Sequence, residues 1–231
     1  MQAVQTQPLP SSMSSIVKKA IMAVTGLFGL GFVFFHMYGN LKIFEGQAYF
    51  NEYAHSLREL GAPIFGHLHL LTVLRLVLIA SVILHVWAAV TLYGRARKAR
   101  ATKYAVKRTV QADYAAVTMR WGGLVVFLFI LFHLADLTWG VNAVSPDFDR
   151  SDPYANVVST FQSLPVVIFY LLALAALGMH LYHGTWSMFQ TLGFLNQRYD
   201  MAVRIFSWIL ALVIPIGFAI VPIAVLAGII A

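Results

Sequence analysis

The sequence predicts an all-α membrane protein with five transmembrane helices. Hydrophobic residues make up 60% of its 231 residues and charged residues only 11%, and the mean hydropathy is +0.76. A soluble domain carries about 25% charged residues. Five apolar segments are each long enough to cross a hydrocarbon core of about 30 Å, which takes roughly 20 helical residues. These segments leave no room for a large soluble domain.

The chain is predicted to consist of a short tail, residues 1–17, and one transmembrane domain, residues 18–231. The tail lacks an apolar run. Because the first apolar stretch is long enough to span and no small-residue cleavage site follows it, we expect a retained helix and not a signal peptide. The predicted spans are 18–41, 67–93, 119–140, 164–190 and 203–230.

Two of the segments between the spans have distinct patterns. Segment 44–66 has apolar residues at helical spacing with charges between them, and it ends in a Gly-Ala-Pro break. This pattern predicts an interfacial helix. Segment 141–163 is polar and contains Asp152-Pro153, which predicts an irregular loop.

Lys and Arg gather on one side of the predicted membrane, whereas Asp and Glu dominate the opposite loops. The positive-inside rule then places the N-terminus in the cytoplasm and the C-terminus outside, as expected in a bacterial cytoplasmic membrane. Topology and anionic lipid explain the net charge of +7 without nucleic acid. A docking surface for a cytoplasmic partner is a compatible second explanation, and its candidate residues are the basic residues of 95–108, Arg120, Asp113 and Tyr114.

Four histidines recur at nearly constant intervals, one in each of the first four spans. His36, His85, His133 and His180 are 49, 48 and 47 residues apart. A histidine inside a bilayer is costly and usually functional, and imidazole is an axial ligand of haem iron. The alternative is that they are hydrogen-bonded polar residues of a helix bundle. Zinc is less suitable, since it takes four ligands at one point. The chain has no cysteine, so a haem would be bound non-covalently and any iron–sulfur cluster would belong to a partner.

Depth along the spans determines which histidines can face one another. With a rise of 1.5 Å per residue, His36 lies about 27 Å from the basic end of its span and His133 about 20 Å. His85 lies about 15 Å from that end, and His180 lies at a similar depth. The predicted pairs are His36 with His133 in the outer half and His85 with His180 in the inner half. The first four helices would then form a bundle around two b haems.

Other polar residues in the spans are candidate binding residues. Arg75 needs an anionic partner, either a propionate of the outer haem or Asp136, unless its side chain snorkels to the interface. Asp136 is that partner or part of a proton route to an outer quinone site. His183 binds a propionate of the inner haem or a quinone, faces water, or replaces His180 as ligand. A candidate inner quinone site comprises His183, Trp186 and Gln190.

Four segments, in order along nearly the whole chain, resemble the cytochrome b subunit of succinate dehydrogenases of the single-anchor, di-haem b558 type. Any one segment alone would be a weak signal, but four in order across five spans are specific. The segments are TGLFGLGFVFFHMYGNL around His36, LHVWAAVTLYGRARKAR around His85, TMRWGGLVVFLFILFHL leading to His133, and GMHLYHGTWSMFQTLG around His180.

The resemblance implies a membrane anchor of respiratory complex II that passes electrons through two b haems to a quinone, usually menaquinone. Its partners would be a flavoprotein subunit with covalent FAD and an iron–sulfur subunit, and the anchor alone would not oxidise succinate. The family pairs ligands from helices one and three and from helices two and four. Its fourth-helix ligand precedes a glycine by four residues, which selects His180 and Gly184.

One departure from the family's pattern concerns the direction of the reaction, succinate oxidation or fumarate reduction. Some di-haem fumarate reductases have a proton-carrying glutamate where this chain has Gly178, which mildly favours succinate oxidation. The alternatives are a fumarate reductase anchor running in reverse, the cytochrome b anchor of another dehydrogenase, and a transporter with an intramembrane proton relay. The sequence leaves open whether the complex forms a higher oligomer.

Overall fold

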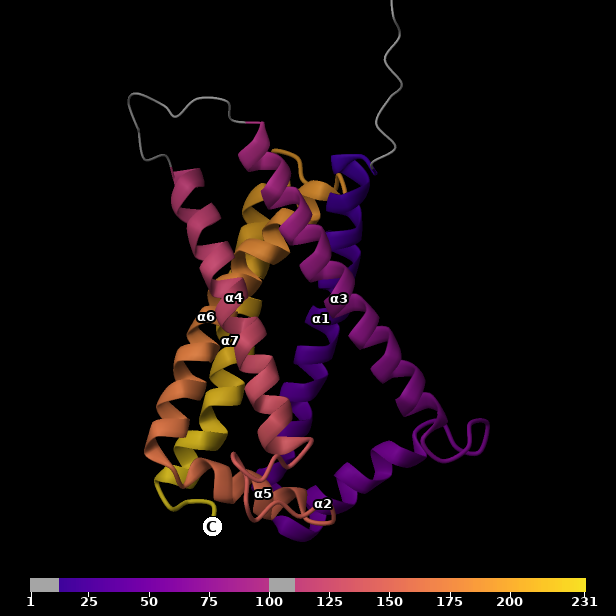
Figure 1. Cartoon of the computed structure of the whole chain (residues 1–231), viewed down its shortest axis with the longest axis vertical. Coiled ribbons are helices and arrows are strands. Elements are labelled where there is room, and N and C mark those ends of the chain that lie inside the picture. Colours follow the sequence, from indigo (N-terminus) through magenta and orange to yellow (C-terminus); the bar gives the residue numbers. More distant parts are fainter. Residues whose placement is uncertain (1–12, 100–110) are drawn as a thin grey trace, which may run out of the picture.

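Helices account for all of the regular structure in the residues that the structure describes. It is a computed structural model that describes residues 13–99 and 111–231, without the side chains of 111–117 (Figure 1). Within these residues, five helices are long and apolar enough to cross a membrane. The predicted fold class, an all-α membrane protein, is confirmed.

The long helices alternate in direction and are joined at one end by short helices. The long helices are α1 (Ser15–Leu41), α3 (His69–Lys98), α4 (Gln111–Leu137), α6 (Leu164–Thr191) and α7 (Asp200–Leu226). The short ones are η1 (Lys42–Glu45), α2 (Gln47–Ser56), η2 (Leu57–Glu59) and α5 (Pro153–Phe161). Segment 44–66 therefore contains a helix, as predicted, but a shorter one.

The helix ends follow local capping chemistry. α1 begins three residues before the predicted start, because the Ser14 side chain accepts a hydrogen bond from the Val17 N–H. α7 ends at Leu226, four residues before the predicted end. There Gly228 has a φ of 70°, and the N–H of Ile229 donates to the Ala224 carbonyl, which closes the helix in a Schellman motif.

The prediction of an irregular loop over 141–163 was wrong in its second half, which forms α5. The Asp152 side chain accepts a hydrogen bond from the Ala155 N–H at 3.0 Å, and Pro153 occupies the first turn. Proline is tolerated there because its missing N–H would have no helical partner. Asp-Pro thus starts a helix in this chain.

The helices pack as two groups joined through α1. α6 and α7 pack closely, α3 packs on α1, α4 packs on α6, and α1 contacts both α6 and α7. Close approach of α6 to α7 depends on Gly178, because a Cβ there would lie 2.9 Å from the Ala211 carbonyl oxygen. α3 leans away from α1 toward one end of the molecule (Figure 1).

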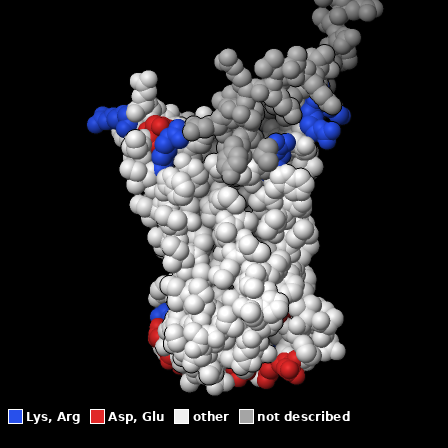
Figure 2. Space-filling model, turned by 90° about the vertical axis from the view of Figure 1, so that its left-hand side faces the viewer, with Lys and Arg blue, Asp and Glu red and all other residues white. Residues whose placement is uncertain are grey.

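Charge divides the two ends of the molecule. On the face shown in Figure 2, Lys and Arg cluster at the end where α1 begins, here called the basic end, and Asp and Glu are concentrated at the opposite, acidic end, with an uncharged band between them. α2, α5 and the C-terminus lie at the acidic end (Figure 1). Of the candidate docking residues, 100–108 and the side chains of Asp113 and Tyr114 lie outside the described residues.

Candidate functional site

The four histidines form two pairs inside the bundle. The rings of His36 on α1 and His133 on α4 are 5.8 Å apart between centroids, with their planes at 76°. The rings of His85 on α3 and His180 on α6 are 6.1 Å apart, with their planes at 61°. The structure thus brings together the same pairs that the depth argument predicts.

At these separations the two imidazoles of each pair could hold one metal ion between them. A histidine nitrogen lies about 2.0–2.1 Å from a bound metal, so two such rings across one ion have centroids roughly 6 Å apart. In the described part of the chain, no three His, Asp or Glu side chains gather as a metal site without a macrocycle would require. Two imidazoles held at this separation would suit a haem iron, whose other ligands a porphyrin would supply.

Hydrogen bonds orient His85 toward its partner. Its Nδ1 lies 3.1 Å from the Met22 carbonyl oxygen and 3.2 Å from the Thr25 Oγ1. The Thr25 hydroxyl donates to the Ile21 carbonyl at 2.7 Å, so both neighbours can accept from His85. Nδ1 then carries the proton, and Nε2 keeps the lone pair that binds a metal.

The other three histidines differ in what their Nδ1 atoms meet. His133 Nδ1 lies 3.2 Å from the Tyr170 hydroxyl, and His36 Nδ1 lies 3.5 Å from the Asn40 side-chain nitrogen. His180 Nδ1 is buried and has no partner among the described residues.

Two glycines lie against the histidines of the His85–His180 pair. A Cβ on Gly26 of α1 would lie 3.4 Å from His85 Cε1, and one on Gly123 of α4 would lie 3.6 Å from His180 Cε1. Each glycine comes ten residues before the histidine of the other pair on its own helix. The sequence contains this Gly-x9-His spacing twice, as Gly26–His36 and Gly123–His133, and the repeat, which the sequence prediction did not include, relates the α1–α3 unit to the α4–α6 unit.

Arg75 and Asp136 do not meet. Arg75 is exposed on α3, and no ion pair or hydrogen bond to it is found among the described residues. Asp136 is 2% exposed and is hydrogen-bonded by Ser145, Thr160 and Tyr170. Asp136 therefore has partners other than Arg75.

The three residues of the predicted inner quinone site lie in different surroundings. His183 lines a largely apolar groove of about 500 Å³ on α6 and α7, together with Tyr182 and Trp208. The Trp186 Nε1–H donates to Asp200 at 3.3 Å, and Arg204 lies over its ring. Gln190 is exposed. Only His183 of the three lines this groove.

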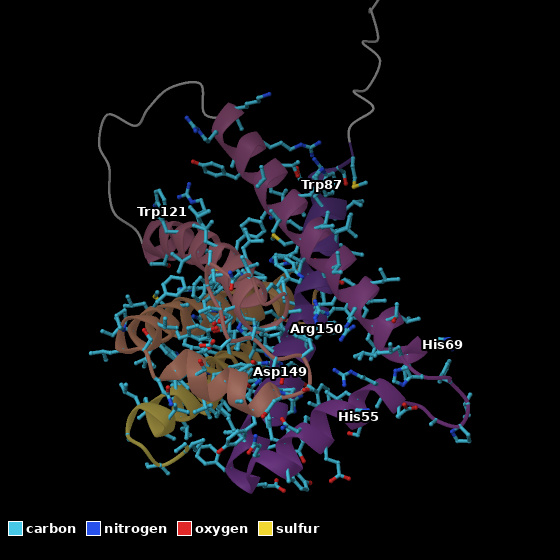
Figure 3. All side chains as sticks on the ribbon, turned by 60° about the horizontal axis from the view of Figure 1, so that its bottom comes forward. His55, His69, Trp87, Trp121, Asp149 and Arg150 are labelled. Atoms are coloured by element: carbon cyan, nitrogen blue, oxygen red, sulfur yellow. The ribbon has the colours of Figure 1, made fainter. Side chains whose placement is uncertain are left out.

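The candidate outer site at Asp136 has a cavity of its own. Asp136, Ser145 and Thr160 line a cavity of about 250 Å³ at the acidic end. His55 on α2 and His69 at the start of α3 also lie at the acidic end (Figure 3). Trp87 and Trp121 lie toward the basic end (Figure 3). His67 pairs with Glu59 at 2.5 Å.

Comparisons with family models, with curated proteins and with solved structures found no match to this chain. The histidine geometry and the sequence pattern are therefore the basis for a functional assignment.

Proposed function

We propose that this chain is the di-haem cytochrome b anchor of a succinate dehydrogenase in a bacterial cytoplasmic membrane. It would pass electrons from an iron–sulfur subunit to a quinone, which we expect to be menaquinone. The supporting observation is that four histidines form two pairs, His36 with His133 and His85 with His180. The rings of each pair are separated by the distance expected for two histidines that bind one iron. The choice of succinate dehydrogenase among haem-containing anchors is supported by the sequence resemblance.

The chain's own residues would hold and orient the cofactors. A haem bound by two histidines supplies one-electron transfer. Hydrogen bonds at Nδ1 fix which nitrogen His85 and His133 present. The exposed guanidinium of Arg75 is suited to pair with a haem propionate. The flavin and the clusters would belong to subunits docked at the basic end.

Haem content after single histidine replacement tests the proposal. We expect two b haems per chain in the purified complex, measured as pyridine haemochrome. His36→Ala or His133→Ala should remove one haem, and His85→Ala or His180→Ala should remove the other.

His183→Ala is the matched control, because His183 lies three residues from His180 on the same helix but lines the α6–α7 groove. It should keep both haems. A wild-type complex without haem would contradict the proposal, and loss of a haem in His183→Ala but not in His180→Ala would overturn the ligand assignment.

The electron donor identifies the dehydrogenase. Succinate alone should reduce part of the haem, and flavoprotein and iron–sulfur subunits should co-purify with the chain. Reduction by formate or hydrogen, with no response to succinate, would instead indicate the anchor of another dehydrogenase.

A further inference from the structure

Tyr170 of α6 is fixed beside the ligand candidate His133 of α4. Its side chain is 5% exposed, and its hydroxyl lies 3.2 Å from His133 Nδ1. The rings of Phe129 and Phe161 each lie 4.8 Å from the Tyr170 ring and nearly perpendicular to it. Phe129 also stacks on His133 at 5.7 Å. The tyrosine ring is therefore packed on two sides and cannot easily move its hydroxyl away.

Asp136 determines the direction of the hydrogen bond at Tyr170. The Tyr170 hydroxyl lies 3.3 Å from Asp136 Oδ2, and Thr160 Oγ1 lies 3.1 Å from Oδ1. Ser145 also donates to Oδ1. A carboxylate only accepts hydrogen bonds, so Tyr170 donates to Asp136 and its oxygen remains free to accept from the His133 Nδ1–H.

We propose that Tyr170, fixed by Asp136, is the positioning residue of His133. It keeps the proton on Nδ1, directs Nε2 toward His36, and holds the imidazole plane at its angle to the plane of His36. Such an acceptor also strengthens a histidine as a metal donor. The inference depends on the proposed function, because it concerns the haem bound by His36 and His133.

The second pair provides an internal reference. His85 has a different acceptor, the Met22 carbonyl, and His180 Nδ1 has no partner among the described residues. A change at Tyr170 should therefore affect one haem of the two.

The test is Tyr170→Phe in the whole complex, with Tyr154→Phe as the matched control. Tyr154 lies at the same end, but its hydroxyl donates to the Ala231 carbonyl at 3.3 Å. In Tyr170→Phe we expect the midpoint potential of one haem to rise, since a weaker donor stabilises ferric iron less. The low-spin ferric EPR signal of the same haem should shift, because it depends on the angle between the two imidazole planes.

Tyr154→Phe should leave both haems unchanged. The positioning role would be overturned if the wild-type complex has two haems and Tyr170→Phe leaves both midpoint potentials and both EPR signals unchanged. The proposed function would then remain intact. A wild-type complex lacking the His36–His133 haem would overturn both. If Tyr170→Phe does not assemble, Asp136→Asn is measured instead: a shifted EPR signal of one haem supports the role, and unchanged signals overturn it.

Discussion

Gly26 allows the α1 backbone to approach the His85 imidazole. A Cβ there would lie 3.4 Å from His85 Cε1, so a methyl group fits only tightly and a branched side chain would displace the ring. We expect Gly26→Val to lose the haem of the His85–His180 pair and to keep the other. Haem content and redox titration of the purified complex measure this.

Gly31→Val is the control on the same helix, because no atom lies within 4 Å of a Cβ at Gly31. Both haems should remain. Equal haem loss in the two variants would mean that valine disturbs α1 as a whole, and the specific contact with His85 would then be wrong.

The pairing of the four histidines could be predicted from the sequence because helical rise gives the depth of each one. Their hydrogen-bond partners could not. Tyr170 is 37 residues from His133 and Met22 is 63 residues from His85, and which side chains meet across two helices depends on the crossing angle and rotation of each. The crossing angle and rotation depend on how the helices pack, which the spacing of apolar residues along the sequence does not determine.

Asp152 joins two short helices at the acidic end. It accepts the Ala155 N–H as the N-cap of α5, and it accepts the side-chain N–H groups of Asn51 and Gln47 from α2 at 2.8 and 2.7 Å. These bonds, the Ala155 N–H first and Asn51 next, lower the pKa of Asp152 below its usual value. Asp152→Ala should destabilise α5 by about 1 kcal/mol, the usual effect of losing an N-cap.

The lowered pKa gives this contribution a pH dependence. It is fully present above the unfolded value of about 3.9 and is lost as pH falls through the lower folded value. Hydrogen exchange of α5 amides should therefore accelerate in Asp152→Ala at pH 6, and the difference from wild type should shrink in strong acid. Asp147→Ala, at an exposed aspartate of the preceding loop, should not change exchange in α5. An α5 equally protected in Asp152→Ala would contradict the capping role.

Gly178 determines how closely α6 approaches α7. A Cβ there would lie 2.9 Å from a backbone oxygen of Ala211 and 3.4 Å from Pro215 Cγ, and neither can rotate away. Gly178→Ala should lower the thermal stability of the complex, at an overpacking cost of about 1–3 kcal/mol. Gly94→Ala, where no atom lies within 4 Å, should not. Equal stability of the two variants would contradict this packing role.

At the scale of elements, the long helices were predictable and the short connections less so. Five apolar segments of spanning length can form little else in a membrane, because every backbone polar group must bond internally. α5 was missed because polar composition and Asp-Pro are typical of both a loop and a capped helix start. The two buried valines and Phe161 of α5 pack where α2 and α7 cover the helix. This tertiary packing distinguishes a helix from a loop here, and it cannot be read from the sequence.

The distribution of charge over the whole molecule predicts its orientation in the membrane. Lys and Arg gather at the basic end and Asp and Glu mainly at the acidic end (Figure 2), and cytoplasmic loops carry the excess of Lys and Arg. We therefore expect the α6–α7 connection to face the cytoplasm and the segment before α5 to face outward.

The absence of cysteine makes this orientation directly measurable. Single variants Ser151→Cys, next to Arg150 at the acidic end (Figure 3), and Gln197→Cys, in the α6–α7 connection, place one exposed thiol at each end without changing the charge asymmetry. A membrane-impermeant maleimide should label Ser151→Cys in intact spheroplasts and Gln197→Cys only after lysis, while the parent chain takes no label. The reverse pattern would place the basic end outside, where the iron–sulfur subunit could not reach it, and would therefore also contradict docking of a cytoplasmic dehydrogenase at that end.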